Sequence, residues 1–217
     1  MVKSGLEVTP EEVPRVSPYR LCAHLLSAIG IYAGMVWTLM DLIRPTVAVT
    51  TPIPYRVRYL AGGLLTMVLA TVTSGAFVAG LDAGLVYNEF PKMGEGYVPE
   101  EYSRMQPFWK NMFENDAAVQ FNHRLVAICT FIAINLVYIL NFRMIEKLPR
   151  GLNHGFRGLV GMSWVQVALG ITALLTFVPV PVASAHQAMA LGMTTVGLSA
   201  LHVSRRKQIK VPLPALK

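Results

Sequence analysis

Residues 59–81 read YLAGGLLTMVLATVTSGAFVAGL and contain no charged residue. An α-helix rises 1.5 Å per residue, so about 20 apolar residues cross a hydrocarbon core of roughly 30 Å. A charge at the centre of such a helix costs about 2.5–3.5 kcal/mol, so a long uncharged block is typical of a membrane span. The segment therefore predicts a transmembrane helix from about residue 57 to residue 80.

Four further blocks also lack Asp, Glu, Lys and Arg, and they cover residues 21–40, 125–142, 158–185 and 187–204. Pro179 and Pro181 separate the last two blocks, because proline ends one helix and is tolerated in the first turn of the next. Charged residues make up only 14% of the 217 residues, against roughly 25% in soluble domains. We expect an all-α, polytopic membrane helix bundle with five transmembrane helices.

Polar and proline-containing segments divide the chain into four expected parts. These are an extramembrane lead-in over 1–18, a first helix over 19–42, a four-helix bundle over 57–204 and a basic tail over 205–217. The expected bundle helices cover about 57–80, 116–142, 155–178 and 183–204, and Asn115 or Asp116 is expected to cap the second of these. The long 82–117 connection is either a functional loop or a carrier of interfacial aromatic residues such as Trp109.

The net charge of +7 follows from where the basic residues lie. One side of the expected bundle, with the N-terminus and the 82–117 loop, holds seven Lys or Arg and ten of the twelve acids. The other side, with the C-terminal tail, holds twelve Lys or Arg and two acids. By the positive-inside rule the second side faces cytoplasm or matrix. The expected surroundings are membrane lipid, and no nucleic-acid partner is expected.

A repeated eight-residue sequence pattern occurs in the first and last expected helices. Residues 23–30 read AHLLSAIG and residues 185–192 read AHQAMALG, so both fit Ala-His-x-x-x-Ala-x-Gly. The repeat places His24 and His186 near the same end of two helices that run in the same direction. The 19–42 helix then corresponds to the last helix of the bundle, and we expect it to close an earlier bundle whose other helices precede this chain. Chance similarity between two apolar helices is the alternative.

His123 is expected at a depth similar to that of His186, because it opens another helix on the same side. Polar rings are costly in hydrocarbon, so two of them at one depth favour a shared ligand over two separate hydrogen bonds to loop carbonyls. Paired helical imidazoles in a bundle suit haem iron. Arg124 is expected either to pair with a haem propionate or to anchor the helix at the membrane surface.

The other polar residues of the helices suggest no site. His154 and His202 are expected to be solvated or interfacial. Gln166 and Asn135 are expected to form hydrogen bonds between helices. The sequence contains no phosphate-binding loop, no cysteine pair with metal spacing and no nucleophile triad.

Several stretches resemble the family of mitochondrial haem A synthases, which are enzymes of cytochrome oxidase assembly. They are SGAFVAGLDAGLVYN at 74–88, FPKMG at 90–94, FEN at 113–115, VQFNHR at 119–124 and the 179–187 segment that contains His186. The resemblance covers nearly the whole chain. It implies two similar four-helix bundles, of which this chain matches only the fourth to eighth helices.

The resemblance implies that a methyl group of haem O is oxidised to a formyl group, which gives haem A. It implies a haem b between His123 and His186 as cofactor, and the substrate haem O in the missing half with His24 as one axial ligand. The metal ligands implied for this chain are therefore His24, His123 and His186. The matching glutamate and second histidine of the substrate site lie on a helix that this chain lacks, so the chain alone is expected to bind haem b without converting haem O.

The same resemblance implies a mitochondrial inner membrane protein with its N-terminus toward the intermembrane space and its C-terminus toward the matrix. The implied partners are the missing N-terminal half and haem O synthase. The loop cysteine pair of bacterial relatives is absent here, so no disulfide-based redox role is implied. Two other functions stay open, namely a stand-alone membrane b-type cytochrome for electron transfer and a non-catalytic assembly subunit.

Overall fold

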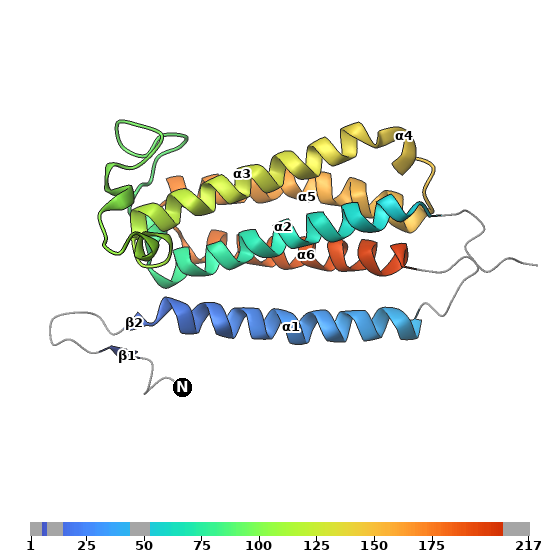
Figure 1. Cartoon of the computed structure of the whole chain (residues 1–217), viewed down its shortest axis with the longest axis horizontal. Coiled ribbons are helices and arrows are strands. Elements are labelled where there is room, and N and C mark those ends of the chain that lie inside the picture. The colour runs from blue at the N-terminus through green and yellow to red at the C-terminus, as the bar shows by residue number, and fades with distance from the viewer. Residues whose placement is uncertain (1–5, 8–14, 44–52, 206–217) are drawn as a thin grey trace, which may run out of the picture.

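The computed structural model describes residues 6–7, 15–43 and 53–205. Most of the expected lead-in, most of the 43–56 connection and the tail beyond residue 205 lie outside these residues. Five long helices dominate the structure, and they are α1 (Pro18–Ile43), α2 (Tyr55–Gly80), α3 (Asp116–Leu140), α5 (Arg150–Leu175) and α6 (Val180–Ser204) (Figure 1). The all-α prediction is therefore confirmed.

Shorter elements complete the described chain. A two-residue antiparallel pair, β1 (Leu6–Glu7) and β2 (Arg15–Val16), precedes α1, and the one-turn helix α4 (Phe142–Ile145) follows α3. The connection between α2 and α3 carries three 3-10 helices, η1 (Ala83–Leu85), η2 (Glu100–Ser103) and η3 (Phe108–Met112). As expected, Asn115 caps α3, and its side-chain oxygen accepts a hydrogen bond from the backbone N–H of Ala118.

Helices α2, α3, α5 and α6 form a four-helix bundle, and α1 lies beside it against α2 and α6 (Figure 1). Within the bundle α2 and α5 each pack against both α3 and α6, so α3 and α6 are diagonal partners. Helices α1, α3 and α6 all begin at the end that carries the α2–α3 connection. We call this the loop end and the opposite end, where α6 stops, the tail end.

Four of the long helices, α1, α2, α3 and α5, are long and apolar enough to cross a membrane. Helix α6 is not among these four, although it has 25 residues and contains no Asp, Glu, Lys or Arg. Its sequence includes several neutral polar residues. Two of these, Thr194 and His202, are buried within the protein, so part of this helix is suited to the bundle interior rather than to lipid.

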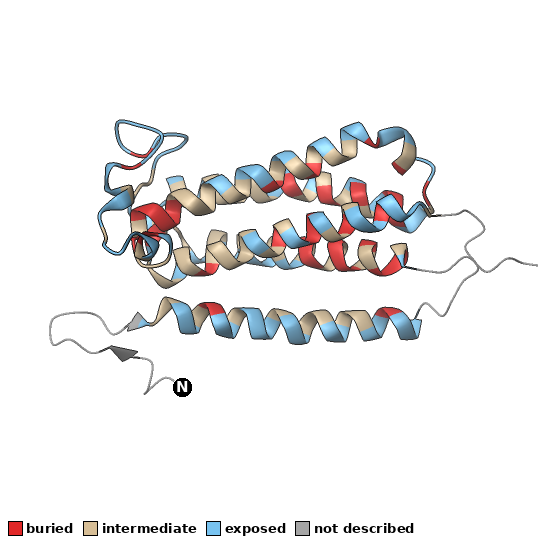
Figure 2. Ribbon diagram, viewed as in Figure 1, coloured by how far each residue is buried: buried red, intermediate tan, exposed pale blue. Residues whose placement is uncertain are grey.

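The hydrophobic core fills the tail-end half of the bundle, and Figure 2 shows buried residues there and also at the loop-end start of α3. Its members come from all four bundle helices and from the turn after α3, and they are Val57, Ala61, Leu64, Val68, Ile134, Ile145, Leu148, Leu152, Phe156, Leu159, Met193, Ala200 and Val203. In the loop-end half of α2, α5 and α6, the buried positions are few, with Ala76 and Ala173 as examples. The main hydrophobic cluster thus lies at the tail end, while at the loop end the buried residues of the bundle come mostly from the first turn of α3, Ala117–Gln120.

Polar and aromatic contacts fix α1 along its whole length. At the loop end the Tyr19 hydroxyl donates to a Glu114 carboxylate oxygen at 2.9 Å, and the Tyr19 ring meets Phe77 edge to face. Midway, the hydroxyls of Tyr32 and Thr195 lie 2.7 Å apart. Because these contacts reach α2, α6 and the α2–α3 connection, α1 is held firmly against the bundle.

The tail-end contact of α1 corrects the expectation for His202. This residue was expected to be solvated or interfacial, but it is only 4% exposed, and its Nε2 lies 2.6 Å from Oδ1 of Asp41 on α1. The Trp37 ring packs edge-on against the His202 ring, and the Arg205 guanidinium lies 4.2 Å from the centre of the Trp37 ring. Position near a helix end suggested exposure, whereas the neighbouring helix covers the ring. His154 is exposed as expected.

Candidate functional site

His123 and His186 lie at matching depth on diagonal helices. His123 is seven residues after the start of α3 and His186 is six residues after the start of α6, which places them about 10 Å and about 9 Å from the loop end. Both residues are half-buried. The structure therefore places the two histidines at one depth of the same bundle, in the half that lacks the main hydrophobic core.

The His123 ring lies against a glycine of the neighbouring helix α2. A Cβ atom at Gly75 would lie 3.1 Å from Cε1 of His123, which is closer than such contacts normally are. Nδ1 of the ring lies 2.8 Å from the Ser74 hydroxyl oxygen. Glycine is thus required here for the close approach of the ring to α2, and serine supplies its polar partner.

The His186 ring has the corresponding position on helix α5. A Cβ atom at Gly170 would lie 3.0 Å from Cε1 of His186. Nε2 of the ring lies 3.3 Å from the side-chain amide nitrogen of Gln166, whereas the buried Nδ1 has no hydrogen-bond partner. Gln166 thus makes an inter-helix contact, as expected, and so does Asn135, whose side-chain oxygen accepts a hydrogen bond from Trp164 Nε1 at 3.2 Å.

The donor set of this site consists of two imidazoles, and it defines what the site is able to bind. Among the described residues no group of three or more His, Cys, Asp and Glu side chains could hold a bare metal ion. Two imidazoles supply only the axial ligands of a metal whose other ligands come from a planar macrocycle. The two glycine contacts fit such a group, because they hold one imidazole against α2 and the other against α5 at similar depth in the bundle.

Arg124, next to His123, is half-buried and reaches the α2–α3 connection. Its two terminal nitrogens donate to the backbone carbonyls of Tyr87 at 2.9 Å and Lys92 at 3.2 Å. Its Nε is buried and has no partner, and neither has the side-chain oxygen of Gln120, one helical turn earlier. Arg124 therefore fixes the loop above the site and keeps one buried donor free.

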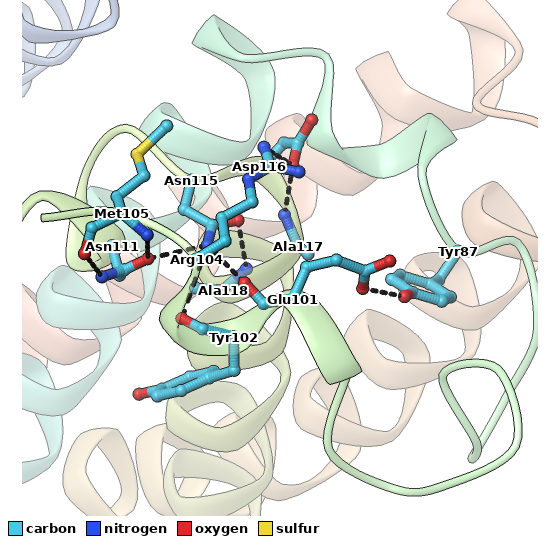
Figure 3. A network of polar contacts seen from close by, with 10 residues as sticks. All are labelled: Tyr87, Glu101, Tyr102, Arg104, Met105, Asn111, Asn115, Asp116, Ala117 and Ala118. Carbon is cyan, nitrogen blue, oxygen red and sulfur yellow. Dashed lines mark hydrogen bonds and ion pairs between the residues drawn. The ribbon is translucent and has the colours of Figure 1, made fainter.

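A polar network folds the α2–α3 connection over the loop end of the bundle (Figure 3). The side-chain amide of Asn115 donates to the Glu101 carbonyl at 2.7 Å and to the Asn111 side-chain oxygen at 2.9 Å. Arg104 forms an ion pair with Asp116 at 2.7 Å. Asn111 and Asn115 are almost completely buried, so the loop is an ordered cover rather than a loose link.

The same network holds an acid–phenol pair on the surface of the loop. The Tyr87 hydroxyl donates to a Glu101 carboxylate oxygen at 2.5 Å. This hydrogen bond lowers the pKa of Glu101 and raises the pKa of Tyr87 to about 12, because it stabilises the charged carboxylate and the neutral phenol. The Glu101 carboxylate therefore stays charged and the Tyr87 phenol neutral across the neutral pH range.

His24 is not brought to the site. It is exposed on α1, which lies outside the four-helix bundle. The residues that sequence reasoning missed are Ser74, Gly75 and Gly170, although the segment that begins at Ser74 was part of the family resemblance. The available signal was a glycine five residues before the C-terminal end of both α2 and α5. It becomes informative only once the side of each helix that faces a histidine is known.

Comparison with known proteins gives a consistent set of relatives. The family of cytochrome oxidase assembly proteins, COX15-CtaA, matches residues 1–198. The chain is 44% identical over 209 residues to heme A synthase COX15 of Bos taurus, covering 95% of this chain and 50% of that protein. It is 44% identical over 223 residues to heme A synthase COX15 of Arabidopsis thaliana, covering 100% of this chain and 47% of that protein.

A bacterial relative is also similar. The chain is 39% identical over 208 residues to heme A synthase of Nitrosospira multiformis, covering 95% of this chain and 57% of that protein. The chain thus spans about half the length of these relatives. No solved structure matches the chain.

Proposed function

Because this chain belongs to the COX15-CtaA family of cytochrome oxidase assembly proteins, we propose that it supplies the haem b-binding half of a haem A synthase. The observation that carries the proposal is the pair of imidazoles from diagonal helices, each laid against a glycine of the next helix. The pair lies at one depth in the bundle half without the hydrophobic core. A planar macrocycle between the two imidazoles would bury the half-exposed surfaces of His123 and His186.

His123 and His186 would hold the iron as axial ligands. Haem b held by two histidines carries one electron at a time. Arg124 would neutralise a propionate through the donor that is free in this structure, since charge-assisted hydrogen bonds to carboxylates are strong. The ordered loop above the site would exclude water from this end of the bundle.

The proposed reaction is oxidation of a methyl group of haem O to the formyl group of haem A. Haem O would bind in the N-terminal half that the longer relatives have in addition, and His24 would be one of its ligands. The position of His24 supports this, because it is exposed on the α1 face that points away from this bundle. Gly30 and Gly34, one turn apart on α1, have no atoms within 4 Å of a built Cβ, and such positions allow close helix packing.

We place the protein in the mitochondrial inner membrane, with the N-terminus toward the intermembrane space and the C-terminus toward the matrix. The mitochondrial relatives and the four candidate spans support this location. Proposed partners are the N-terminal half and haem O synthase, which would deliver the substrate.

The proposal is tested by purifying the chain in detergent and measuring haem b per protein as the pyridine haemochrome. We expect nearly one haem b per chain in the wild type and in His24→Ala, and a loss of most of it in His123→Ala and His186→Ala. Circular dichroism shows whether each variant keeps its helices. Haem content unchanged in either of the last two variants contradicts the assignment of the ligands.

A second measurement tests the reaction. The chain is supplied with haem O and a reductant, alone and together with the N-terminal half of a longer relative, and haem A is measured by chromatography. We expect haem A only in the combined sample. Haem A made by the chain alone refutes the proposal that the substrate binds in the other half. Haem b binding without haem A in both samples favours a stand-alone b-type cytochrome, whose two-histidine site is complete in this chain.

A further inference from the structure

The hydrogen bonds around Ser74 determine which nitrogen of His123 carries its proton. The Ser74 hydroxyl lies 2.8 Å from His123 Nδ1, and the same hydroxyl donates to the backbone carbonyl of Thr71 at 2.8 Å. A hydroxyl has one proton and two lone pairs. Because the proton is directed at a carbonyl, the contact with His123 is made by a lone pair of the serine oxygen.

A lone pair on Ser74 requires a proton on Nδ1 of His123. Ser74 is the hydrogen-bond partner that the structure gives to Nδ1, and it therefore acts as an acceptor. A neutral imidazole carries one N–H, so the lone pair of the ring lies on Nε2.

We propose that Ser74 is a positioning residue that holds His123 in the Nδ1–H tautomer and thereby makes Nε2 the atom that binds iron. The inference rests on the proposed haem site. Gly75 takes part in the same arrangement, because its missing side chain lets the ring lie 3.1 Å from where a Cβ would be. The ring is thus held by a hydrogen bond at Nδ1 and by the α2 backbone on one side.

His186 provides an internal comparison, because it lacks this support. Its Nδ1 has no hydrogen-bond partner, and its Nε2 lies beside the Gln166 amide instead. Before it can bind iron through Nε2, Gln166 has to move away. The two ligands are therefore unequal, with His123 fixed in advance and His186 adjusting when the haem enters.

The hydrogen bond from Nδ1–H has consequences for a bound metal. A partner of this kind orients the ring and makes the ligand more basic, and its removal typically weakens metal binding about 10–100-fold. A more basic ligand favours the ferric state. Loss of Ser74 should therefore weaken haem retention about tenfold and shift the midpoint potential to more positive values.

The first test uses the haem-free full chain, labelled with 15N in its histidines and held in detergent micelles. Ring-nitrogen chemical shifts distinguish the two tautomers, and the His123 signals are identified by their loss in His123→Gln. We expect the Nδ1–H tautomer in the wild type and a mixture in Ser74→Ala. The matched control is Thr73→Ala, whose hydroxyl donates to the Leu69 carbonyl and does not touch the site. The Nε2–H tautomer in the wild type, or identical shifts in Ser74→Ala, overturns the inference.

The second test uses the haem-loaded chain and compares the rate of haem transfer to apomyoglobin and the midpoint potential. We expect about tenfold faster transfer and a more positive potential in Ser74→Ala, with Thr73→Ala unchanged. Equal rates and potentials in Ser74→Ala and the wild type contradict the positioning role. A different result would refute the haem proposal itself, namely a haem content that is unchanged in His123→Ala. In that case the tautomer measurement on the haem-free chain still tests whether Ser74 holds the His123 ring.

Discussion

Gly75 and Gly170 set the distance between each imidazole and the neighbouring helix. An added Cβ would lie 3.1 Å from the His123 ring at one site and 3.0 Å from the His186 ring at the other. The ring would have to move by a few tenths of an ångström in each case. Each ring belongs to a side chain that packs between helices, so this displacement changes the direction in which Nε2 points.

We predict that Gly75→Ala and Gly170→Ala each reduce haem affinity about tenfold, because axial ligands tolerate little misplacement. The controls are Gly63→Ala on α2 and Gly161→Ala on α5, where a Cβ meets nothing within 4 Å. These controls should be neutral or stabilising by about 0.5–1 kcal/mol, as Gly→Ala usually is within a helix. The measurements are haem titration and thermal unfolding, and equal haem affinity in Gly75→Ala and Gly63→Ala argues against the contact.

The sequence predicted that His123 and His186 lie at one depth of the bundle, but not what surrounds them. His123 and His186 were recognised because polar rings at one depth in apolar helices are unusual. Ser74, Gly75 and Gly170 were not, because serine and glycine occur throughout apolar helices as packing residues. Their role depends on the rotation of α2 and α5 about their axes, and α6 and α3 determine that rotation by packing on both sides.

At the scale of elements, the α2–α3 connection is stabilised partly by the pair of Tyr87 and Glu101. The folded-state pKa of Glu101 lies below its usual value near 4.5, so its contribution is present above that pH and is lost as the pH falls through the folded-state pKa. The folded-state pKa of Tyr87 is about 12 instead of 10, so its contribution is present below pH 10 and is lost as the pH rises toward 12.

We therefore predict that the difference in melting temperature between the wild type and Tyr87→Phe is constant from about pH 5 to about pH 9.5 and shrinks outside this range. Both groups lie at the surface, so the difference is expected to be small. Tyr97→Phe is the control, since Tyr97 is 67% exposed in the same connection. A difference that stays constant below pH 4 and above pH 10.5 contradicts the role of the pair.

Helix α1 depends on the contact between Asp41 and His202 at its tail end. We predict that Asp41→Asn speeds hydrogen exchange of the last turn of α1 about fivefold, which corresponds to about 1 kcal/mol. The effect is limited because the Asp41 side chain is 59% exposed. Leu42→Ala, at a position 73% exposed, serves as the control and should leave this exchange unchanged. Unchanged exchange in Asp41→Asn would show that the aromatic contact of Trp37 holds this end alone.

The element order was predictable because membrane helices give a strong signal. Uncharged blocks located all five long helices, and Asn115, one of the two residues expected to cap α3, is its cap. The polar residues Thr194 and His202 of α6 are buried within the protein. The cover of His202 by α1 was missed, because contacts between helices distant in sequence leave no local pattern.

At the scale of the whole molecule, the bundle is divided along its length. The tail-end half is filled with aliphatic and aromatic side chains from all four helices. The loop-end half carries His123 and His186, and the α2–α3 connection at this end is held by the polar network of Figure 3. The packed half gives the bundle its stability, since buried apolar area is the main favourable term. We propose that the other half binds the haem and that helix α1 packs against a second bundle.

The central claim is that one iron is bound between His123 and His186. Electron paramagnetic resonance of the purified, oxidised chain tests it most directly, because two imidazole ligands give a low-spin ferric signal. We predict this signal in the wild type and in His24→Ala, and its loss in both His123→Ala and His186→Ala. A high-spin signal in the wild type, or a low-spin signal that persists in either of the last two variants, would contradict the claim.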